Sequence, residues 1–248
     1  MKDNYYDDIA FDYHLKRKFS WRPLELYIQE QKNKGFEFHG LSLDLGCANG
    51  RHFNLFKNDF NVLVGIDLSF EFLKIAIENI KNRRSRSSST FQHINVVQAN
   101  VLNLPVRPNI FQNIYSIATI HHLKNKIDRF KAIEQILEAI KSDGVFLMTV
   151  WRRYQKKYRY YFIIDKLKRL FKPMYKKTQE NKGFKFHGDN FIPWTLSKNS
   201  KTYQRFYHFF SKKELKKLLK EFKIIDMSKN GGSTNKDNFF VIAKTRAN

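Results

Sequence analysis

Short apolar runs alternate along the first 151 residues with stretches in which apolar side chains recur every three or four positions. The runs have the length of β-strands, and their nearly uninterrupted apolar character is typical of strands buried on both faces. They occupy residues 41–46, 62–67, 94–99, 113–120 and 144–151. The pattern therefore predicts five buried strands in this part of the chain.

The stretches between these runs predict helices. Residues 51–58 can form a short helix, and Ser69 can cap a second one, whose apolar positions are Phe70, Leu73, Ile77 and Ile80. A third helix is expected over 127–140, followed by a turn at 142–144, and the polar segment 83–90 predicts a loop. Strands and helices that alternate at this spacing predict right-handed crossovers and a doubly wound, mostly parallel sheet.

The end of the chain completes this sheet. Ser211 and Glu214 have the spacing of a capping box and open a helix with an apolar face of Leu215, Leu218, Leu219 and Phe222. Residues 223–228 and 238–245 then predict two further strands joined by a glycine-containing turn. The expected fold is therefore α/β, with a doubly wound, mostly parallel sheet of seven strands.

The segment between these two parts has a different composition. Residues 152–182 hold 12 Lys and Arg against two acids, with seven Tyr and Phe interleaved. We find no internal repeat in the chain. We therefore expect a single domain over residues 1–248 that carries a basic and aromatic insertion for substrate recognition at 152–210.

The charge balance changes the expected partner. Lys and Arg number 46 and Asp and Glu 23, a formal net charge of +23, which favours nucleic acid or an acidic membrane surface as partner. The single cysteine, Cys47, excludes an intrachain disulfide and a thiolate zinc site, as is typical of a reducing compartment. The most apolar runs have only strand length, so we expect no spanning helix. We expect a cytoplasmic location, with the nucleus as a further compartment.

The candidate cofactor site follows the first strand, at Asp44-Leu45-Gly46-Cys47-Ala48-Asn49-Gly50. Glycine here lets the backbone approach a ligand, and Asp67, 21 residues after Gly46, can accept hydrogen bonds from both ribose hydroxyls. Arg51 stands where a dinucleotide site needs its third glycine, and the chain has no phosphate-binding loop. A nucleoside site without a pyrophosphate-binding loop indicates S-adenosylmethionine as the cofactor. The alternative is that this segment is an ordinary strand–turn–helix connection that binds no cofactor.

These motifs also carry a resemblance. The segment from Asp44 to Gly50, followed by Gly65-Ile66-Asp67, resembles the first two motifs of class I methyltransferases. Further segments resemble, in order, the tRNA wobble carboxymethyluridine methyltransferases: 5–21, 101–123, 145–151, 191–194, 204–210 and 237–243. The resemblance covers nearly the whole chain. It implies a Rossmann-like fold and methyl transfer from S-adenosylmethionine to the carboxylate of a 5-carboxymethyl wobble uridine, which gives the methyl ester.

The resemblance also implies the residues of the cofactor site. Asp44, Gly46 and the backbone at Ala48 would hold the methionine part, and Asp67 the ribose. Asn100 and Val101 would flank the adenine, and Ala118 would contact the sulfonium side. The chain departs from its relatives at Ala48, where glycine is usual, at Leu68, where arginine is frequent, and at Asn100, where aspartate is usual. These changes affect the expected affinity rather than the identity of the cofactor.

On the substrate side, the resemblance makes Arg205 the candidate cation for the carboxylate; a surface arginine is the alternative. His121 and His122 follow the fourth strand, and because side chains alternate along an extended backbone, we expect only one of them, His121 rather than His122, to face the site. Trp151 can stack on the uracil or be a core residue. Other predicted contacts are Trp194, Tyr207 and His208 in the pocket wall, and Arg17 and Trp21 over cofactor or base. We expect no general base and no metal in this chain.

The expected partners follow from the same features. The cations and rings of 152–182 can contact phosphates and unpaired bases of a tRNA anticodon loop; an acidic membrane is the alternative, and we expect no membrane partner. The resemblance also implies a small zinc-binding activator protein, and hence a heterodimer. We expect it to extend the sheet along 94–99, the edge strand in the superfamily's order, unless the N-terminal segment covers that edge. Other hypotheses are a class I methyltransferase for another RNA atom or a small acid, and a non-catalytic RNA-binding module.

Overall fold

The computed structural model describes residues 5–56, 60–84 and 93–246. Their main feature is a seven-stranded sheet in the order β3-β2-β1-β4-β5-β9-β8, in which β1 to β5 are parallel and β9 runs antiparallel between β5 and β8. The strands are β1 Gly40–Leu45, β2 Phe60–Asp67, β3 Ile94–Gln98, β4 Phe111–Ile117, β5 Ile140–Trp151, β8 Phe222–Asn230 and β9 Asn238–Thr245. The predicted doubly wound α/β sheet is confirmed.

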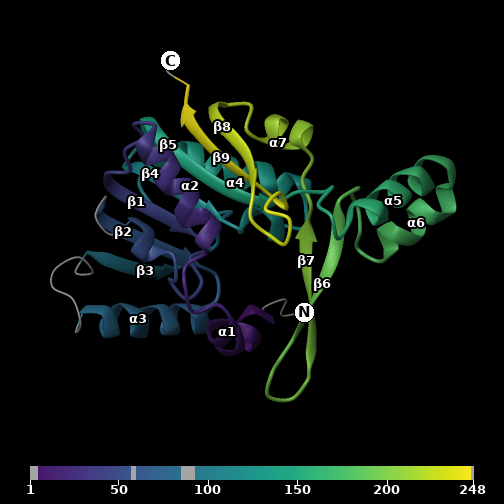
Figure 1. The fold of residues 1–248 in the computed structure, drawn as a ribbon, viewed down its shortest axis with the longest axis horizontal. Coiled ribbons are helices and arrows are strands. Elements are labelled where there is room, and N and C mark those ends of the chain that lie inside the picture. Colours follow the sequence, from purple (N-terminus) through teal and green to yellow (C-terminus); the bar gives the residue numbers. More distant parts are fainter. Residues whose placement is uncertain (1–4, 57–59, 85–92, 247–248) are drawn as a thin grey trace.

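Helices cover both faces of this sheet (Figure 1). One apolar core lies between the sheet and α4 (Lys126–Ala139) with α7 (Lys212–Leu218). The other lies between the sheet and α2 (Arg22–Asn33) with α3 (Phe70–Arg84). Helix α1 (Tyr5–Lys16) packs on α3. Because β1 and β4 are neighbours while the chain winds outward from each, their carboxyl ends form the crevice in which such sheets bind ligands.

The predicted insertion forms a separate group of elements. It contains α5 (Arg159–Phe171), α6 (Pro173–Asn181) and an antiparallel pair of strands, β6 (Asp189–Thr195) and β7 (Thr202–His208). In Figure 1 the two helices lie at the periphery of the molecule, away from the main sheet. A small core joins helices and strands, made of Phe162, Ile192, Tyr207 and Phe209. The single-domain organisation of the chain stays a prediction.

The predicted helix caps are confirmed. The Ser69 hydroxyl accepts from the Phe72 backbone N–H at 3.2 Å and opens α3. At α7, the Ser211 hydroxyl accepts from the Glu214 N–H at 3.2 Å, while the Glu214 carboxylate accepts from the Ser211 N–H at 3.5 Å. Both helices therefore begin where side-chain oxygens satisfy backbone donors that the helix itself leaves free.

The expected apolar face of α3 is wrong in half of its members. Phe70 and Ile77 are exposed, whereas Phe72 and Ala76 are buried together with the expected Leu73 and Ile80. Apolar residues on this helix fit two overlapping stripes, and only packing against the sheet and α1 selects one of them. The sequence periodicity predicted the helix correctly, but not which of its faces is buried.

Three other details differ from the predictions. A single 3-10 turn, Phe53–Phe56, takes the place of the helix expected over 51–58, whose last two residues lie outside the described residues. Residues 83 and 84 of the loop expected over 83–90 belong to α3, and its other residues lie outside the described residues. The turn expected at 142–144 lies inside β5 as an irregularity: Phe111 pairs with Ile140, but Asn113 already pairs with Val145. Asp143 absorbs this bulge with a φ of +63°.

Candidate active site

A cavity of about 790 Å³ lies at the carboxyl ends of the central strands. Its walls come from α1, from the ends of β1, β2, β4 and β5, and from the β6–β7 hairpin. Every predicted site residue except His208 lines it: Arg17, Trp21, Asp44, Gly46, Ala48, Asp67, Asn100, Val101, Ala118, His121, Trp151, Trp194, Arg205 and Tyr207. The fold therefore brings together residues that extend along the chain from Arg17 to Tyr207, although their individual roles stay predictions.

The turn after β1 is shaped for close approach to a ligand. Gly46 has a φ of +73°, and a Cβ there would overlap the Thr119 side chain. Ala48 has a φ of +47°, a conformation that costs a non-glycine residue about 1–2 kcal/mol. The Ala48 backbone N–H donates to Asp67 Oδ2 at 2.9 Å, which offsets part of this strain. Alanine is thus accommodated where relatives have glycine, at a local cost.

Asp67 is held by backbone groups at the end of β2. Its Oδ1 accepts from the Ser69 N–H and its Oδ2 from the Ala48 N–H, both at 2.9 Å. Each carboxylate oxygen has a second acceptor site, so two further donors can be bound from the cavity. Burial raises the pKa of Asp67, and the backbone N–H groups of Ser69, Ala48 and Leu68 act against this rise. The arrangement suits a pair of ribose hydroxyls.

Asp44, at the end of β1, is a buried carboxyl group that lacks a donor. It is 5% exposed, and within the described ranges no side chain or backbone N–H donates to it. Burial and the negative charge of Asp67 raise the pKa of Asp44 to about 7, against a smaller lowering effect of Arg51. A buried carboxylate is stable only when paired, so this position fits the ammonium group of a methionine moiety.

The contacts at the adenine side are partly used by the protein itself. Asn100 Oδ1 accepts from the Leu102 N–H at 2.9 Å, which leaves one acceptor site on this oxygen and both amide N–H donors for a ligand. Ala118 has a φ of +57°, and its N–H donates to Thr149. Both residues lie at the cavity wall together with Val101.

The expectation that only one of the two histidines faces the site is wrong. His121 and His122 lie in a 3-10 turn, Ile120–His122, and not on an extended strand, so alternation does not separate them and both line the cavity. The His121 Nδ1 accepts from the Trp151 N–H at 3.4 Å, and His122 Nδ1 donates to the Phe206 carbonyl at 3.0 Å. Burial lowers the pKa of both rings, for His122 to about 3, so both are neutral at pH 7.

Arg205 on β7 is a buried cation without a counter-ion. The residue is 8% exposed. Its guanidinium carbon lies 4.6 Å from the ring centroid of Trp194 and 5.2 Å from that of Tyr207. Its Nε has no hydrogen-bond partner, and among the described residues no carboxylate lies within ion-pair distance. A buried positive charge costs several kcal/mol unless an anion compensates it. The position is thus suited to an anionic group of a ligand.

Aromatic rings line the same part of the cavity. Trp151 and Tyr207 have ring centroids 4.5 Å apart, and His121 stacks on Tyr207 at 4.9 Å. Trp21 packs on Phe240 at 5.0 Å and faces the cavity with its remaining surface. These rings provide planar surfaces on which a base can stack.

Helix α1 contributes more than the sequence indicated. The Asp12 carboxylate accepts from Trp194 Nε1 at 2.8 Å and from Lys16 Nζ at 2.7 Å, which joins α1 to β6. Burial acts to raise the pKa of Asp12, but these bonds and that from Ser197 outweigh it and lower the pKa to about 2. Tyr6 and Tyr13 also line the cavity. The sequence analysis predicted no helix here, and local sequence spacing does not indicate a partner 182 positions away.

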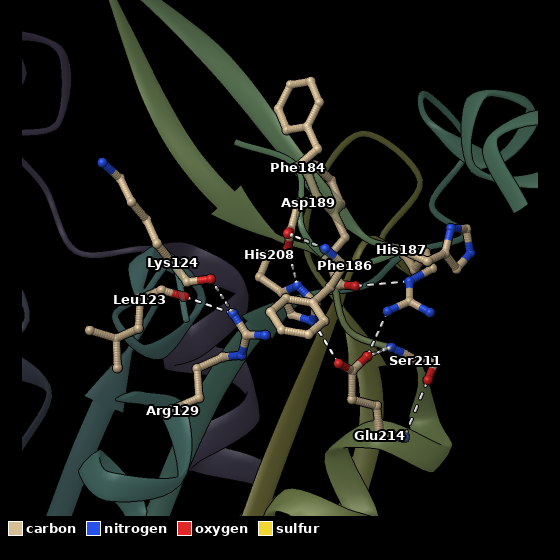
Figure 2. A network of polar contacts seen from close by, with 12 residues as sticks. Leu123, Lys124, Arg129, Phe184, Phe186, His187, Asp189, His208, Ser211 and Glu214 are labelled. Carbon is tan, nitrogen blue, oxygen red and sulfur yellow. Dashed lines mark hydrogen bonds and ion pairs between the residues drawn. The ribbon is translucent and has the colours of Figure 1, made fainter. Parts of the chain in front are cut away.

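His208 does not belong to the cavity wall, and this prediction is wrong. Its Nδ1 lies 2.6 Å from Asp189 Oδ1 and its Nε2 lies 2.7 Å from Glu214 Oε1, as Figure 2 shows. Tyr207 and His208 are successive residues of β7, so their side chains point to opposite faces and only Tyr207 reaches the cavity. Arg153 pairs with the second Glu214 oxygen at 2.6 Å. The network fixes the base of the β6–β7 hairpin against α7.

Within the described ranges, no group of three or more His, Cys, Asp or Glu side chains is arranged to hold a metal ion.

The fold is that of class I S-adenosylmethionine-dependent methyltransferases. Residues 43–148 match the family model "Methyltransferase domain". A solved S-adenosylmethionine-dependent methyltransferase from Methanosarcina mazei superposes with a TM-score of 0.64 at 18% identity, over 88% of this chain and 97% of that one. One from Clostridium acetobutylicum gives 0.65 at 14% identity, over 98% and 100%.

Sequence relatives narrow this class. The chain is 27% identical to the tRNA (carboxymethyluridine(34)-5-O)-methyltransferase of Schizosaccharomyces pombe, over 96% of this chain and 93% of that protein. It is 28% identical to the Arabidopsis thaliana enzyme of the same name over 61% of this chain, and the match spans 32% of that longer protein. Over nearly its whole length, the chain is similar to the tRNA carboxymethyluridine methyltransferases.

Proposed function

We propose that this protein transfers a methyl group from S-adenosylmethionine to the carboxylate of a 5-carboxymethyl wobble uridine in tRNA, giving the methyl ester. The observation that carries the proposal is Arg205, a buried guanidinium without a counter-ion in the same cavity as the cofactor-type carboxylates. The likeness to the Schizosaccharomyces pombe enzyme over nearly the full length of both chains supports the same substrate.

The residues present fit the cofactor. Asp44 would offer a buried carboxylate to its ammonium group and Asp67 two acceptor sites to its ribose, while the backbone of Gly46 lines the cavity beside them. Asn100, Val101 and Ala118 would enclose the adenine and the sulfonium side, with Ala48 completing the turn. When bound, S-adenosylmethionine supplies a methyl group on a positively charged sulfur, and this sulfur keeps the electron pair of the broken C–S bond.

The substrate carboxylate needs no activation by a base. Carboxylic acids titrate near pH 4, so an oxygen lone pair is available at neutral pH, and no proton has to be removed. The chain's task is to align this oxygen, and full alignment is worth about 7–11 kcal/mol of the barrier. Arg205 locates the carboxylate, while Trp151 and Tyr207 provide the surface against which the uracil stacks.

A modest grip on the carboxylate is an advantage here. A cation that bound the ionised carboxylate very tightly would stabilise the ground state and slow the transfer, because the oxygen loses charge as it attacks. The guanidinium of Arg205 also interacts with the faces of Trp194 and Tyr207. These contacts hold it in place, so the carboxylate does not have to order a flexible side chain.

The proposed RNA contacts extend from this cavity to the surface. Arg17, Arg51 and Lys157 line the cavity and are placed to meet phosphates next to a base that enters it. Those cations of residues 152–182 that directly follow β5 would extend the contact along the anticodon loop. We also propose a cytoplasmic location, with the nucleus as a further compartment.

The proposed assembly is a heterodimer with a small zinc-binding activator. It would pair with β3, which lies at one edge of the seven-stranded sheet and has β2 as its neighbour. Val97 on this strand is 39% exposed, so pairing would also cover apolar surface. Zinc would belong to the activator and lie away from methyl transfer.

Mass spectrometry of wobble nucleosides from cells lacking the protein tests the proposed function. We expect unesterified 5-carboxymethyluridine to accumulate, and a plasmid copy of the gene to restore the ester. Loss of a different methylated nucleoside with the ester intact would move the activity to another RNA atom. Failure of the purified protein, with its partner, to bind S-adenosylhomocysteine in calorimetry would instead favour a non-catalytic RNA-binding module.

A further inference from the structure

Helix α5 carries a stripe of large apolar side chains on its exposed side. Their spacing of three, four and seven positions places them on one face of the helix. Their exposed fractions range from 43% for Ile163 to 77% for Phe171, and Met174 at the start of α6 continues the surface at 75%. The members of this stripe are Tyr160, Ile163, Ile164, Leu167, Leu170 and Phe171.

The opposite side of α5 is bonded to the protein through polar groups. Asp165, 2% exposed, accepts two hydrogen bonds from Arg169 Nε at 3.0 and 2.8 Å and one from the Tyr175 hydroxyl at 3.1 Å. It also lies 2.9 Å from His187 Nδ1. Phe162 packs beside this group against Phe209. The network fixes the rotation of α5, so the helix cannot roll to bury its apolar stripe.

Cations border the stripe on both sides. At 100° per residue, Arg159 and Lys166 fall on one border and Lys168 on the other, and all three are exposed. The surrounding segment, residues 152–182, has 12 Lys and Arg against two acids. An exposed apolar face with basic borders is the pattern of helices that lie in the interface of a membrane.

We propose that the exposed face of α5 binds an anionic lipid surface, with the helix lying flat and its apolar stripe among the acyl chains. The 13 residues of α5 span about 20 Å, a length suited to lying in the interface. No described helix is long and apolar enough to cross a bilayer. The peripheral place of the α5–α6 pair in Figure 1 lets a flat surface approach it without meeting the main sheet. This differs from the sequence-based expectation of no membrane partner.

RNA explains this face less well. Cations bind phosphates and planar rings stack on bases, but the branched side chains of Ile163, Ile164 and Leu167 can do neither. Burying them against a wet polyanion would leave their apolar surface uncompensated. The apolar stripe is best buried against an apolar partner, and the cations at its borders are best paired with anions. An anionic bilayer provides both.

Vesicle flotation of the full chain, alone and with its partner, tests the proposal. We expect binding to vesicles containing about 30% phosphatidylserine, weaker binding at high salt, and little binding to pure phosphatidylcholine. The double variant Ile164→Asn/Leu167→Asn should lower the partition coefficient on anionic vesicles about tenfold or more. The matched control is Ile127→Asn on α4, a position 80% exposed outside the insertion, which should bind as the unchanged protein does.

Two further measurements separate the alternatives. Fluorescence anisotropy with an anticodon stem–loop RNA should give the same affinity for the double variant and the unchanged chain, and light scattering should give the same mass. Absence of binding to anionic vesicles at low salt, or equal binding by the double variant, overturns the proposal. Loss of RNA affinity or of self-association in the double variant, with vesicle binding unchanged, assigns the face to RNA or to a second copy instead. Because the variants lie outside the cavity, methyl transfer in solution is expected to persist, so failure here leaves the proposed function standing.

Discussion

Asp44 and Arg205 are buried in one cavity, and neither has a partner of opposite charge within the described part of the chain. They lie on different elements, Asp44 at the end of β1 and Arg205 on β7. An unpaired buried charge is tolerated where a ligand completes it, and perturbed pKa values concentrate at such places. The cavity is therefore prepared for a ligand cation near Asp44 and a ligand anion near Arg205.

The raised pKa of Asp44 predicts a pH-dependent cofactor affinity. Its pKa of about 7 means that the carboxyl group binds a proton near neutrality, whereas the cofactor's ammonium group favours the ionised form. Affinity for S-adenosylhomocysteine should therefore rise as the pH increases through about 7 and then level off, with a slope approaching tenfold per pH unit on the acid side. Calorimetry over this range measures it.

The control is Asp44→Asn, which should bind more weakly and lose most of this slope, because no proton is released from this position. In the free protein, ionisation of Asp44 lowers the stability, because the pKa of this carboxyl group is raised in the folded state. Asp44→Asn should therefore melt no lower than the unchanged chain at pH 8. The same slope in both proteins would assign the titration to another group.

Arg205 is expected to act on the substrate alone. Replacing it with Gln removes charge-assisted hydrogen bonds worth about 1.5–3 kcal/mol each, so transfer to tRNA should fall about 100-fold while affinity for S-adenosylhomocysteine changes less than about twofold. Arg205→Lys should restore part of the activity, because it keeps the charge without the planar fork. A matched change on the same hairpin, the exposed Lys201→Gln, should have no such effect. Proportional loss of both activities in Arg205→Gln would mean a structural role.

At the scale of elements, the hairpin and the edge strand have different supports. His208 lies between Asp189 and Glu214 and connects the base of the β6–β7 hairpin to α7. Burial acts to raise the pKa of Glu214, but the hydrogen bond and charge of His208 outweigh it and lower the pKa to about 2. The described part of the N-terminal segment packs on α3 and over the cavity, and β3 lies at the sheet edge as predicted.

Strand β3 is expected to bind the activator. Amide exchange at residues 95–98 should be slower in the heterodimer than in the isolated chain, because a new strand would occupy the open side of β3. Val97→Lys should weaken the complex about tenfold or more by placing a charge in the contact. Ile225→Lys on β8, the opposite edge, is the matched control and should leave it unchanged. Full protection of 95–98 in a monodisperse isolated chain would contradict this docking site.

For the whole molecule, the charge of +23 includes two groups of cations to which we assign different partners. Cations at the cavity mouth, such as Lys157, would meet RNA phosphates, whereas those that border the α5 stripe would meet lipid headgroups. Both interactions weaken with salt, so salt dependence alone does not distinguish them. Substitution of individual cations does.

The affinity for tRNA should depend steeply on salt. Each phosphate contact contributes about 0.7–0.9 to the slope of log affinity against log salt concentration. Lys156→Gln/Lys157→Gln should flatten the slope by up to about 1.4–1.8, and Lys212→Gln/Lys213→Gln on α7 should leave it unchanged. Fluorescence anisotropy with full-length tRNA at several salt concentrations measures both. An unaltered slope in the first variant would mean that RNA binds elsewhere.

The sequence by itself determined the seven strands of the main sheet, the helices α3, α4 and α7, the caps at Ser69 and Ser211, and the cofactor-type turn with Asp67. These depend on neighbours within about one helical turn or on the period of apolar positions, and both are local properties. The resemblance to known methyltransferases added the site residues, nearly all of which the fold brings to one cavity.

Only the tertiary structure decided which way side chains face. Periodicity predicted an apolar face on α3, but packing selected another stripe there. The sequence analysis predicted no helix at α5, whose apolar stripe the Asp165 network holds on the exposed side. His208 lies outside the cavity because side chains alternate along β7 and Tyr207 occupies the cavity side. His121 and His122 both line the cavity because they lie in a 3-10 turn. Arg205 lacks a counter-ion because none of the described elements around it brings a carboxylate within ion-pair distance. Such features arise from contacts between distant parts of the chain, and local sequence spacing carries no record of them.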